Sequence, residues 1–110
     1  YLCVDASSDL EGEGISAVVL ILLSVIPLDR EAIIASVAIT GRLLAVEDDY
    51  KSYGVTAEVI ATAVENDISL LRSAPQRVAY PDVSVPFSPP MEKFCLPDKH
   101  DIVAAAKRTF

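Results

Sequence analysis

The chain has 110 residues, of which 52% are hydrophobic and 23% are charged, a length and composition typical of one folded domain. Sixteen Asp and Glu residues outnumber nine Lys and Arg residues, which gives a net charge of −7. No basic stripe is present to neutralise phosphates, so we expect no binding to nucleic acid. The acidic surface favours solubility or a basic protein partner.

Cysteine content and hydropathy narrow the class further. Cys3 and Cys95 form neither a disulfide framework nor a C-x-x-C pair, which favours a reducing compartment. The uncharged run 15–28 is shorter than the roughly 20 residues that span a bilayer, so we expect no membrane segment. Tyr1 is not an initiator and no basic, signal-like region follows it. We therefore expect residues 1–110 to form a single domain that is a fragment of a longer chain.

The first quarter of the chain predicts a helix followed by a strand. Residues 2–10 place apolar side chains at roughly helical spacing, and the glycines at 12 and 14 are typical of a helix end. Residues 15–23 are apolar without alternation, as in a parallel strand that is buried on both faces.

The next segments predict a second helix and a second strand. Asp29 is suited to cap a helix that Gly41 ends. The apolar positions expected on its buried face are Ile33, Ile34, Val37 and Ala38. Residues 42–47 predict a strand that stops in the acidic residues Glu47, Asp48 and Asp49.

The second half continues the alternation. After a loop at 51–53, apolar spacing predicts a helix from about 55 to 66, a short helical turn at 68–71 and a third strand at 76–80. The prolines within 81–96 argue against regular structure there.

The end of the chain predicts a last helix. Asp98 and Asp101 have the spacing of a capping box, and the side chains expected to face inward are Ile102, Val103 and Ala106. Strand–helix alternation at these lengths predicts a three-layer α/β/α fold with a mostly parallel sheet.

The polar residues do not assemble into a predicted active site. His100 is the only histidine, and we expect it to be a solvated surface residue. Glu47, Asp48 and Asp49 follow a predicted strand and could hold Mg²⁺, although a solvated loop is the favoured interpretation. Gly54 precedes a helix without a G-x-G-x-x-G or P-loop pattern, so close packing is expected there.

The possible nucleophiles lack the neighbours that would activate them. Cys3 and Cys95 have no adjacent His or basic cluster, and Ser24 and Ser88 lie in no nucleophile-elbow pattern. We therefore expect no catalytic, cofactor-binding or metal-binding residue, and a domain that is non-catalytic by itself.

Several segments, taken in order, carry a resemblance that none of them would carry alone. They are 25–31 (VIPLDRE), 40–47 (TGRLLAVE), 53–58 (YGVTAE), 77–83 (RVAYPDV), 85–87 (VPF) and 102–105 (IVAA). Their succession resembles the transketolase C-terminal domain of the β subunit of 2-oxoacid dehydrogenases, which are thiamine-diphosphate-dependent oxidoreductases. Residues 82–90 favour this branch over transketolase itself, and the pyruvate and acetoin types within it.

The resemblance implies a parent multienzyme complex that oxidatively decarboxylates a 2-oxoacid and transfers the acyl group to lipoamide. Thiamine diphosphate and Mg²⁺ would bind the parent enzyme outside this domain. The implied partners are the dehydrogenase α subunit, a second β subunit and the basic subunit-binding domain of the acyltransferase. The candidate docking residues are Asp82 and Phe110, the latter through its carboxylate if it is the natural terminus. The implied location is the bacterial cytoplasm or the mitochondrial matrix.

The chain also departs from the family pattern. Relatives begin this domain with further strands, one of them between the strands that correspond to 15–23 and 42–47, and this segment is missing here. The chain would have to pair those two strands directly, borrow a strand, or leave edges exposed. In addition, Val18, Ile21 and Leu23 are aliphatic where relatives carry charged residues.

These departures keep two alternatives open. One is the C-terminal domain of another transketolase-like enzyme that handles substrate directly, against which the absence of a basic phosphate-binding cluster argues. The other is a stand-alone or redesigned α/β module that associates with itself through an exposed apolar edge. The sequence does not identify the 2-oxoacid.

Overall fold

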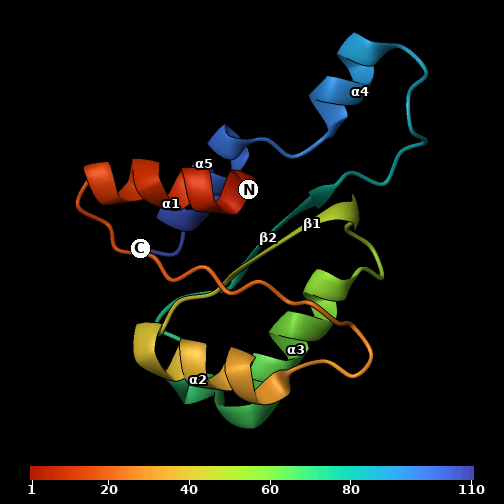
Figure 1. Cartoon of the computed structure of the whole chain (residues 1–110). Coiled ribbons are helices and arrows are strands. Elements are labelled where there is room, and N and C mark those ends of the chain that lie inside the picture. The colour runs from red at the N-terminus through yellow and green to blue at the C-terminus, as the bar shows by residue number, and fades with distance from the viewer.

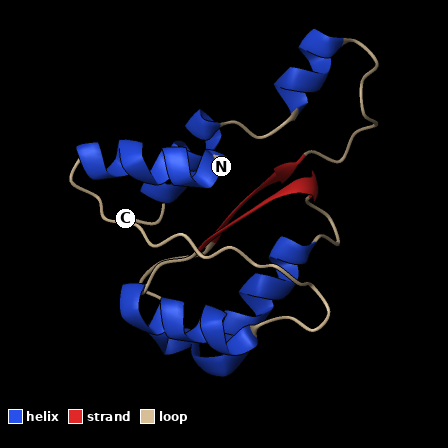
Figure 2. Ribbon diagram, viewed as in Figure 1, coloured by secondary structure: helices blue, strands red, loops and turns tan.

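The computed structural model describes all 110 residues and has helices on both faces of a small sheet (Figures 1 and 2). Helices α1 and α5 cover one face, and α2 and α3 cover the other, which confirms the predicted three-layer α/β/α class. The elements are α1 (Leu2–Gly12), α2 (Arg30–Thr40), β1 (Leu44–Tyr50), α3 (Val55–Asp67), the 3-10 turn η1 (Ile68–Leu70), β2 (Gln76–Tyr80), α4 (Pro89–Cys95) and α5 (Lys99–Lys107).

The sheet consists of two parallel strands. Leu44 lies opposite Gln76 and Val46 lies opposite Val78, after which the register shifts. Tyr50 and Tyr80 end the two strands with their rings in edge-to-face contact, 5.5 Å between centroids. The crossover through α3 that parallel pairing requires is therefore present.

The sheet separates two small hydrophobic cores. On one face, Ala6 of α1 and Ile102 and Ala105 of α5 form a core cluster with Val78 of β2. On the other face, Ile33 of α2 and Val59 of α3 pack against Ala45 of β1. Because neither cluster is large, each pair of helices needs the apolar side chains of the sheet to complete its core.

The predicted helix ends are confirmed. The side chain of Asp29 accepts a hydrogen bond from Ala32 N at 3.1 Å, and Gly41 ends α2 in the left-handed conformation at φ 70°. Asp98 and Asp101 form the complete capping box of α5. These local signals fix where the covering helices begin and end.

The strand predicted at 15–23 is wrong. The segment is irregular, and Val18 and Leu23 are exposed by 65% and 95% (Figure 2). No backbone hydrogen bond involves residues 16–27. The physical reason is that a strand needs a neighbouring strand, and β1 pairs only with β2. Of the three outcomes that the missing segment allowed, the structure has the exposed edge.

Two further predictions need correction. Glu47, Asp48 and Asp49 lie within β1, because pairing with β2 carries the strand on to Tyr50. Residues 81–96 are not wholly irregular, since α4 forms with prolines at its first turn, where no backbone donor is needed. Ser88 caps it by accepting a hydrogen bond from Met91 N.

The inward faces of two helices also differ in detail from the predictions. On α2, Ile33 and Val37 are buried, Ile34 is half-buried and Ala38 is exposed. On α5, Ala105 is fully buried, whereas Val103 and Ala106 are half-buried. The two-stranded sheet is too narrow to cover every apolar side chain on these helices, so some of them stay partly or fully exposed.

No helix has the length and apolar character needed to cross a membrane.

Substituting Gly41→Ala should lower the free energy of unfolding by about 1–2 kcal/mol, because the left-handed conformation disfavours a Cβ atom. The added Cβ would also lie 2.9 Å from the Arg72 side chain. Urea denaturation followed by circular dichroism measures the change. Gly12→Ala is the matched control, since a Cβ there meets nothing within 4 Å. Equal effects at both positions would contradict this explanation.

Hydrogen exchange should separate the irregular segment from the helices. Amides of residues 16–24 should exchange at close to the rate of an unfolded chain, because they have no backbone acceptor. Amides in the middle of α3, such as that of Val59, should be protected. Strong protection within 16–24 in a monomeric sample would show that this segment pairs with another part of the chain.

Candidate functional site

Asp82, the first docking candidate, connects the loops that follow the two strands. Its carboxylate accepts a hydrogen bond from Ser52 N at 3.2 Å and another from the Ser52 hydroxyl. These bonds hold the pKa of the Asp82 carboxyl below its usual value, and the charges of Lys51 and Arg77 add to the effect. Asp82 is therefore an exposed, ionised group in a defined position.

An open hollow lies beside this carboxylate. It has a volume of about 510 Å³ and is lined by Tyr50, Ser52, Asp82 and Val83. The hollow contains a single acidic group and faces solvent at the ends of β1 and β2. Its shape and charge suit a contact with a basic side chain of another protein.

Phe110, the second docking candidate, is held against the beginning of β1. The guanidinium carbon of Arg42 lies 4.2 Å from the centroid of the Phe110 ring. The preceding Thr109 carbonyl accepts hydrogen bonds from Arg42 Nε at 2.9 Å and from Ser73 Oγ at 2.6 Å. The Phe110 side chain nevertheless remains 66% exposed.

The fold does not bring the two docking candidates together within one chain. Asp82 follows the carboxyl end of β2, whereas Phe110 packs on Arg42, which precedes the amino end of β1. β2 alone spans five residues, or about 15 Å at the rise of a strand. A single small partner surface would have to reach along the sheet to touch both residues.

Two of the three acidic residues that were considered for a metal have local structural partners. Glu47 accepts hydrogen bonds from Thr56 Oγ1 at 3.0 Å and from Thr56 N at 3.3 Å, at the first turn of α3. The Asp49 carboxylate accepts one from Tyr50 N. No group of three or more His, Cys, Asp or Glu side chains is arranged to hold a metal ion. Glu47 therefore acts as a cap for α3.

Gly54 confirms the predicted close packing. A Cβ atom at this position would overlap the Glu47 carboxylate and the Tyr50 carbonyl oxygen. The glycine thus lets the loop after β1 approach closely enough for Glu47 to reach Thr56.

The remaining candidates are dispersed. His100 is exposed in the first turn of α5. Cys3 and Cys95 are free and half-buried, and burial raises the pKa of the Cys3 thiol. Ser24 lies in the irregular segment, and Ser88 caps α4. None of these side chains hydrogen-bonds to another candidate nucleophile, acid or base.

The fold also creates a feature that the sequence did not predict. Lys51, Arg77 and Arg108 line one hollow on the outer side of β2. The linear sequence shows no basic cluster, because these residues come from a loop, a strand and a helix far apart in the chain. Only the parallel pairing of β1 and β2, with α5 packed on them, brings the three together.

Titration should show how Ser52 acts on Asp82. In the intact protein, the Asp82 pKa should lie below the usual value for Asp, so the hydrogen bonds from Ser52 persist at neutral pH and are lost as pH falls through that lowered pKa. Ser52→Ala should raise the Asp82 pKa towards the usual value. Carboxyl chemical shifts followed by NMR against pH measure both.

Asp67 offers an internal control, since hydrogen bonds from Ser69 lower its pKa in the same way. Ser69→Ala should raise the pKa of Asp67 and leave that of Asp82 unchanged. A common shift of both carboxyls in either variant would point to a general change in charge or folding instead.

Comparison with known proteins places the chain in a family. Residues 1–102 match the family described as "Transketolase, C-terminal domain". The chain is 45% identical to the pyruvate dehydrogenase E1 component subunit beta-1, mitochondrial, of Arabidopsis thaliana, over 94% of this chain and 28% of that protein. It is 41% identical to the pyruvate dehydrogenase E1 component subunit beta of Bacillus subtilis, over 94% of this chain and 31% of that protein.

Two further matches support the same family assignment. The 2-oxoisovalerate dehydrogenase subunit beta of Bacillus subtilis is 40% identical over 98% of this chain and 33% of that protein. A solved structure titled "Split gene transketolase, inactive beta4 tetramer" matches with a TM-score of 0.78 and 28% identity, over 98% of this chain and 35% of that one. The chain spans about a third or less of the length of these proteins. It belongs to the transketolase C-terminal domain family and corresponds to the C-terminal domain of 2-oxoacid dehydrogenase β subunits.

Proposed function

We propose that this chain is the subunit-assembly and docking domain of a 2-oxoacid dehydrogenase whose parent enzyme oxidatively decarboxylates a 2-oxoacid and passes the acyl group to lipoamide. The domain itself carries no step of this chemistry. The observation that supports the proposal best is the amount of apolar surface that the fold leaves uncovered on two segments.

The first uncovered segment is the arm formed by residues 81–97, which includes α4. In Figure 1 this arm extends away from the sheet and from the other helices, and α4 contains no buried residue. Its exposed apolar side chains are Val83, Val85, Phe87, Met91, Phe94 and Leu96. Phe87 and Phe94 are exposed by 104% and 91%. So many large apolar groups on one projection are typical of an element that packs against another chain or domain.

The second uncovered segment is 15–26, which runs past the sheet without pairing. Its exposed apolar side chains are Val18, Val19, Leu20, Ile21, Leu23, Val25 and Ile26. Only Leu22 packs against the core beneath α2 and α3. A partner that covers this segment would remove a large apolar area from water, at roughly 25 cal/mol per Å². Both segments therefore support contacts with an α subunit and a second β subunit.

The acidic end of the sheet supports a different contact. Asp82 presents an ionised carboxylate beside an open hollow, on a chain of net charge −7. This arrangement suits a basic module such as the subunit-binding domain of the acyltransferase. Where Phe110 is the terminal residue, its carboxylate adds a second negative group at the opposite end of the sheet.

The residues of this chain do not fit the cofactor of the parent enzyme. The structure has no glycine-rich phosphate loop and no grouped carboxylates that could hold Mg²⁺. Thiamine diphosphate and Mg²⁺ would accordingly be held by other domains of the parent enzyme. The parent would work in the bacterial cytoplasm or the mitochondrial matrix, since relatives come from bacteria and from mitochondria.

A self-associating module is the alternative with an observation in its favour. The structural neighbour is titled a β4 tetramer, and the uncovered apolar segments of this chain would also suit pairing between identical copies. Sedimentation of the purified β subunit, with and without the α subunit, separates the two. A stable homotetramer that excludes the α subunit would favour the alternative.

Docking should depend on Asp82 and on salt. In the assembled αβ complex, Asp82→Asn should weaken binding of the basic subunit-binding domain roughly threefold to tenfold, mainly through slower association. Raising the salt concentration should shrink the difference between the two proteins. Surface plasmon resonance measures the rates and the dissociation constant.

Glu65→Gln is the matched control for this experiment. It removes the same charge from an exposed position on α3, away from the hollow beside Asp82. Equal weakening by both variants would reduce the effect to overall charge. Salt-independent binding that neither variant changes would contradict docking through Asp82.

A further inference from the structure

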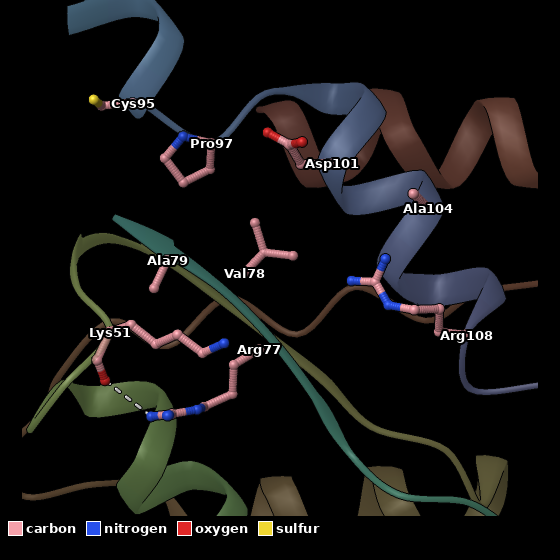
Figure 3. Close-up of a pocket in the computed structure, with 9 residues that line it drawn as sticks. All are labelled: Lys51, Arg77, Val78, Ala79, Cys95, Pro97, Asp101, Ala104 and Arg108. Atoms are coloured by element: carbon pink, nitrogen blue, oxygen red, sulfur yellow. Dashed lines mark hydrogen bonds between the residues drawn. The ribbon is translucent and has the colours of Figure 1, made fainter. Parts of the chain in front are cut away.

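The hollow lined by Lys51, Arg77 and Arg108 has a location and a charge that the proposed assembly role does not explain. It has a volume of about 270 Å³ and lies on the outer side of β2, beneath α5 and the link from α4 to α5. Arg77 and Ala79 contribute the floor, and Pro97 contributes part of the opposite wall (Figure 3).

The cations that line this hollow have no ion-pair partner. The ion pairs of the structure are Arg30–Glu58, Lys99–Asp9 and Lys107–Glu13. Arg77 donates a hydrogen bond to the Lys51 carbonyl at 2.9 Å, and Arg108 Nε donates one to Gln76 Oε1 at 3.3 Å. Neither bond neutralises a charge. In a chain with nine basic residues and net charge −7, three of the nine line this one hollow.

The two free cationic side chains reach the hollow from different sides of β2. In Figure 3 the Lys51 side chain runs below β2, on the side of Arg77 and Ala79, whereas the Arg108 guanidinium extends from α5 towards Val78. The Arg77 guanidinium turns back to the Lys51 carbonyl, as its hydrogen bond requires. Lys51 and Arg108 thus line the hollow with unpaired charges, and Arg77 holds the Lys51 backbone in place.

Two carboxylates lie nearby, and both already accept hydrogen bonds. Asp101, which lines the hollow, accepts one from Asp98 N at 3.0 Å as part of the α5 capping box. Asp82 is close enough to Lys51 and Arg77 for their charges to lower its pKa, but it is hydrogen-bonded to Ser52. Three positive charges against these two negative ones leave the hollow positive on an acidic protein.

The free edge of β2 adds backbone donors. In a parallel ladder the N–H and C=O groups of one residue point to the same side, and the side alternates along the strand. Gln76 N donates to Leu43 O and Tyr80 O accepts from Lys51 N, so these residues face β1. The N–H groups of Arg77 and Ala79 consequently point away from β1, along the edge where the hollow lies.

We propose that this hollow binds a small phosphate-type dianion through Lys51 Nζ, the Arg108 guanidinium and the backbone N–H of Arg77 and Ala79. Unpaired cations together with free backbone amides are the donors that proteins use for phosphate oxygens. The volume lies below the roughly 300–1,000 Å³ of pockets for drug-sized ligands, which restricts the occupant to a small ion or to the phosphate end of a small ester. The site is independent of the docking role and uses neither Asp82 nor Phe110 as a ligand.

Inorganic phosphate is the probe that tests the site. Isothermal titration calorimetry on the assembled αβ complex, without added cofactor and at constant ionic strength set with chloride, should show saturable binding. The double variant Lys51→Gln/Arg108→Gln should weaken this binding by roughly tenfold or more, because both direct side-chain charges are lost. Arg108→Lys should recover part of the affinity, because it keeps the charge and loses the planar guanidinium.

Arg72→Gln is the matched control. Arg72 is an exposed basic residue without an ion-pair partner, and it packs beside Gly41 at the other end of the sheet. Its loss should leave phosphate affinity unchanged within about twofold, which separates a local site from a general effect of charge. Circular dichroism of each variant confirms that the fold is retained; Lys51 and Arg108 are exposed, so their substitution should not disturb the core.

The outcomes decide the proposal. Loss in the double variant with retention in Arg72→Gln supports it. The proposal is overturned if phosphate shows no saturable binding, or if both variants lose affinity equally. It is also overturned if the double variant binds phosphate as well as the unaltered protein does, because the ion then occupies another site. Competition by glycerol 3-phosphate would identify phosphate esters as ligands, whereas binding of inorganic phosphate alone would identify the free ion.

Discussion

The backbone pairing of β1 with β2 is the interaction on which the rest of the structure depends. It is the only ladder in the molecule, and it brings residues about 30 positions apart in the chain side by side. Ala45 of β1 supports the core beneath α2 and α3, and Val78 of β2 supports the core beneath α1 and α5. Each helix pair would lose its apolar floor if the strands separated. A ladder of two strands has little stability by itself, so helices and sheet stabilise one another.

The same pairing leaves two free edges with different chemistry. Along β1, the backbone groups of Leu44 and Val46 point away from β2, and the nearby segment 15–26 is apolar and unpaired. Along β2, the free edge carries Arg77 and lies between Lys51 and Arg108. One edge of the sheet is therefore suited to burial against protein, and the other to binding a charged group. A third strand on either side would remove that distinction.

Prediction from sequence succeeded where the signal was local. Asp29, Gly41 and the Asp98–Asp101 pair mark helix ends through contacts within a few residues, and such contacts form in much the same way in any fold. The strand at 76–80 was also predicted with its observed bounds, because its flanking residues end it on both sides.

Prediction failed where the outcome depended on distant segments. Residues 15–23 have the composition of a buried strand, yet composition cannot supply the neighbour that a strand must pair with. The acidic residues 47–49 were assigned to a loop, whereas pairing with β2 keeps them in β1. The basic hollow was missed for a related reason, because Lys51, Arg77 and Arg108 become neighbours only when the crossover through α3 is complete.

Several acidic side chains are used within the framework of the fold. Glu47 caps α3, Asp98 and Asp101 cap α5, and Asp82 ties the two loops that follow the strands. Each of these carboxylates is engaged in holding one end of an element. The apolar residues on the arm and on segment 15–26, in contrast, have nothing to hold within the chain. In the proposed assembly, the uncovered apolar side chains would pack against other chains, and the unpaired cations beside β2 would be available to bind an anion.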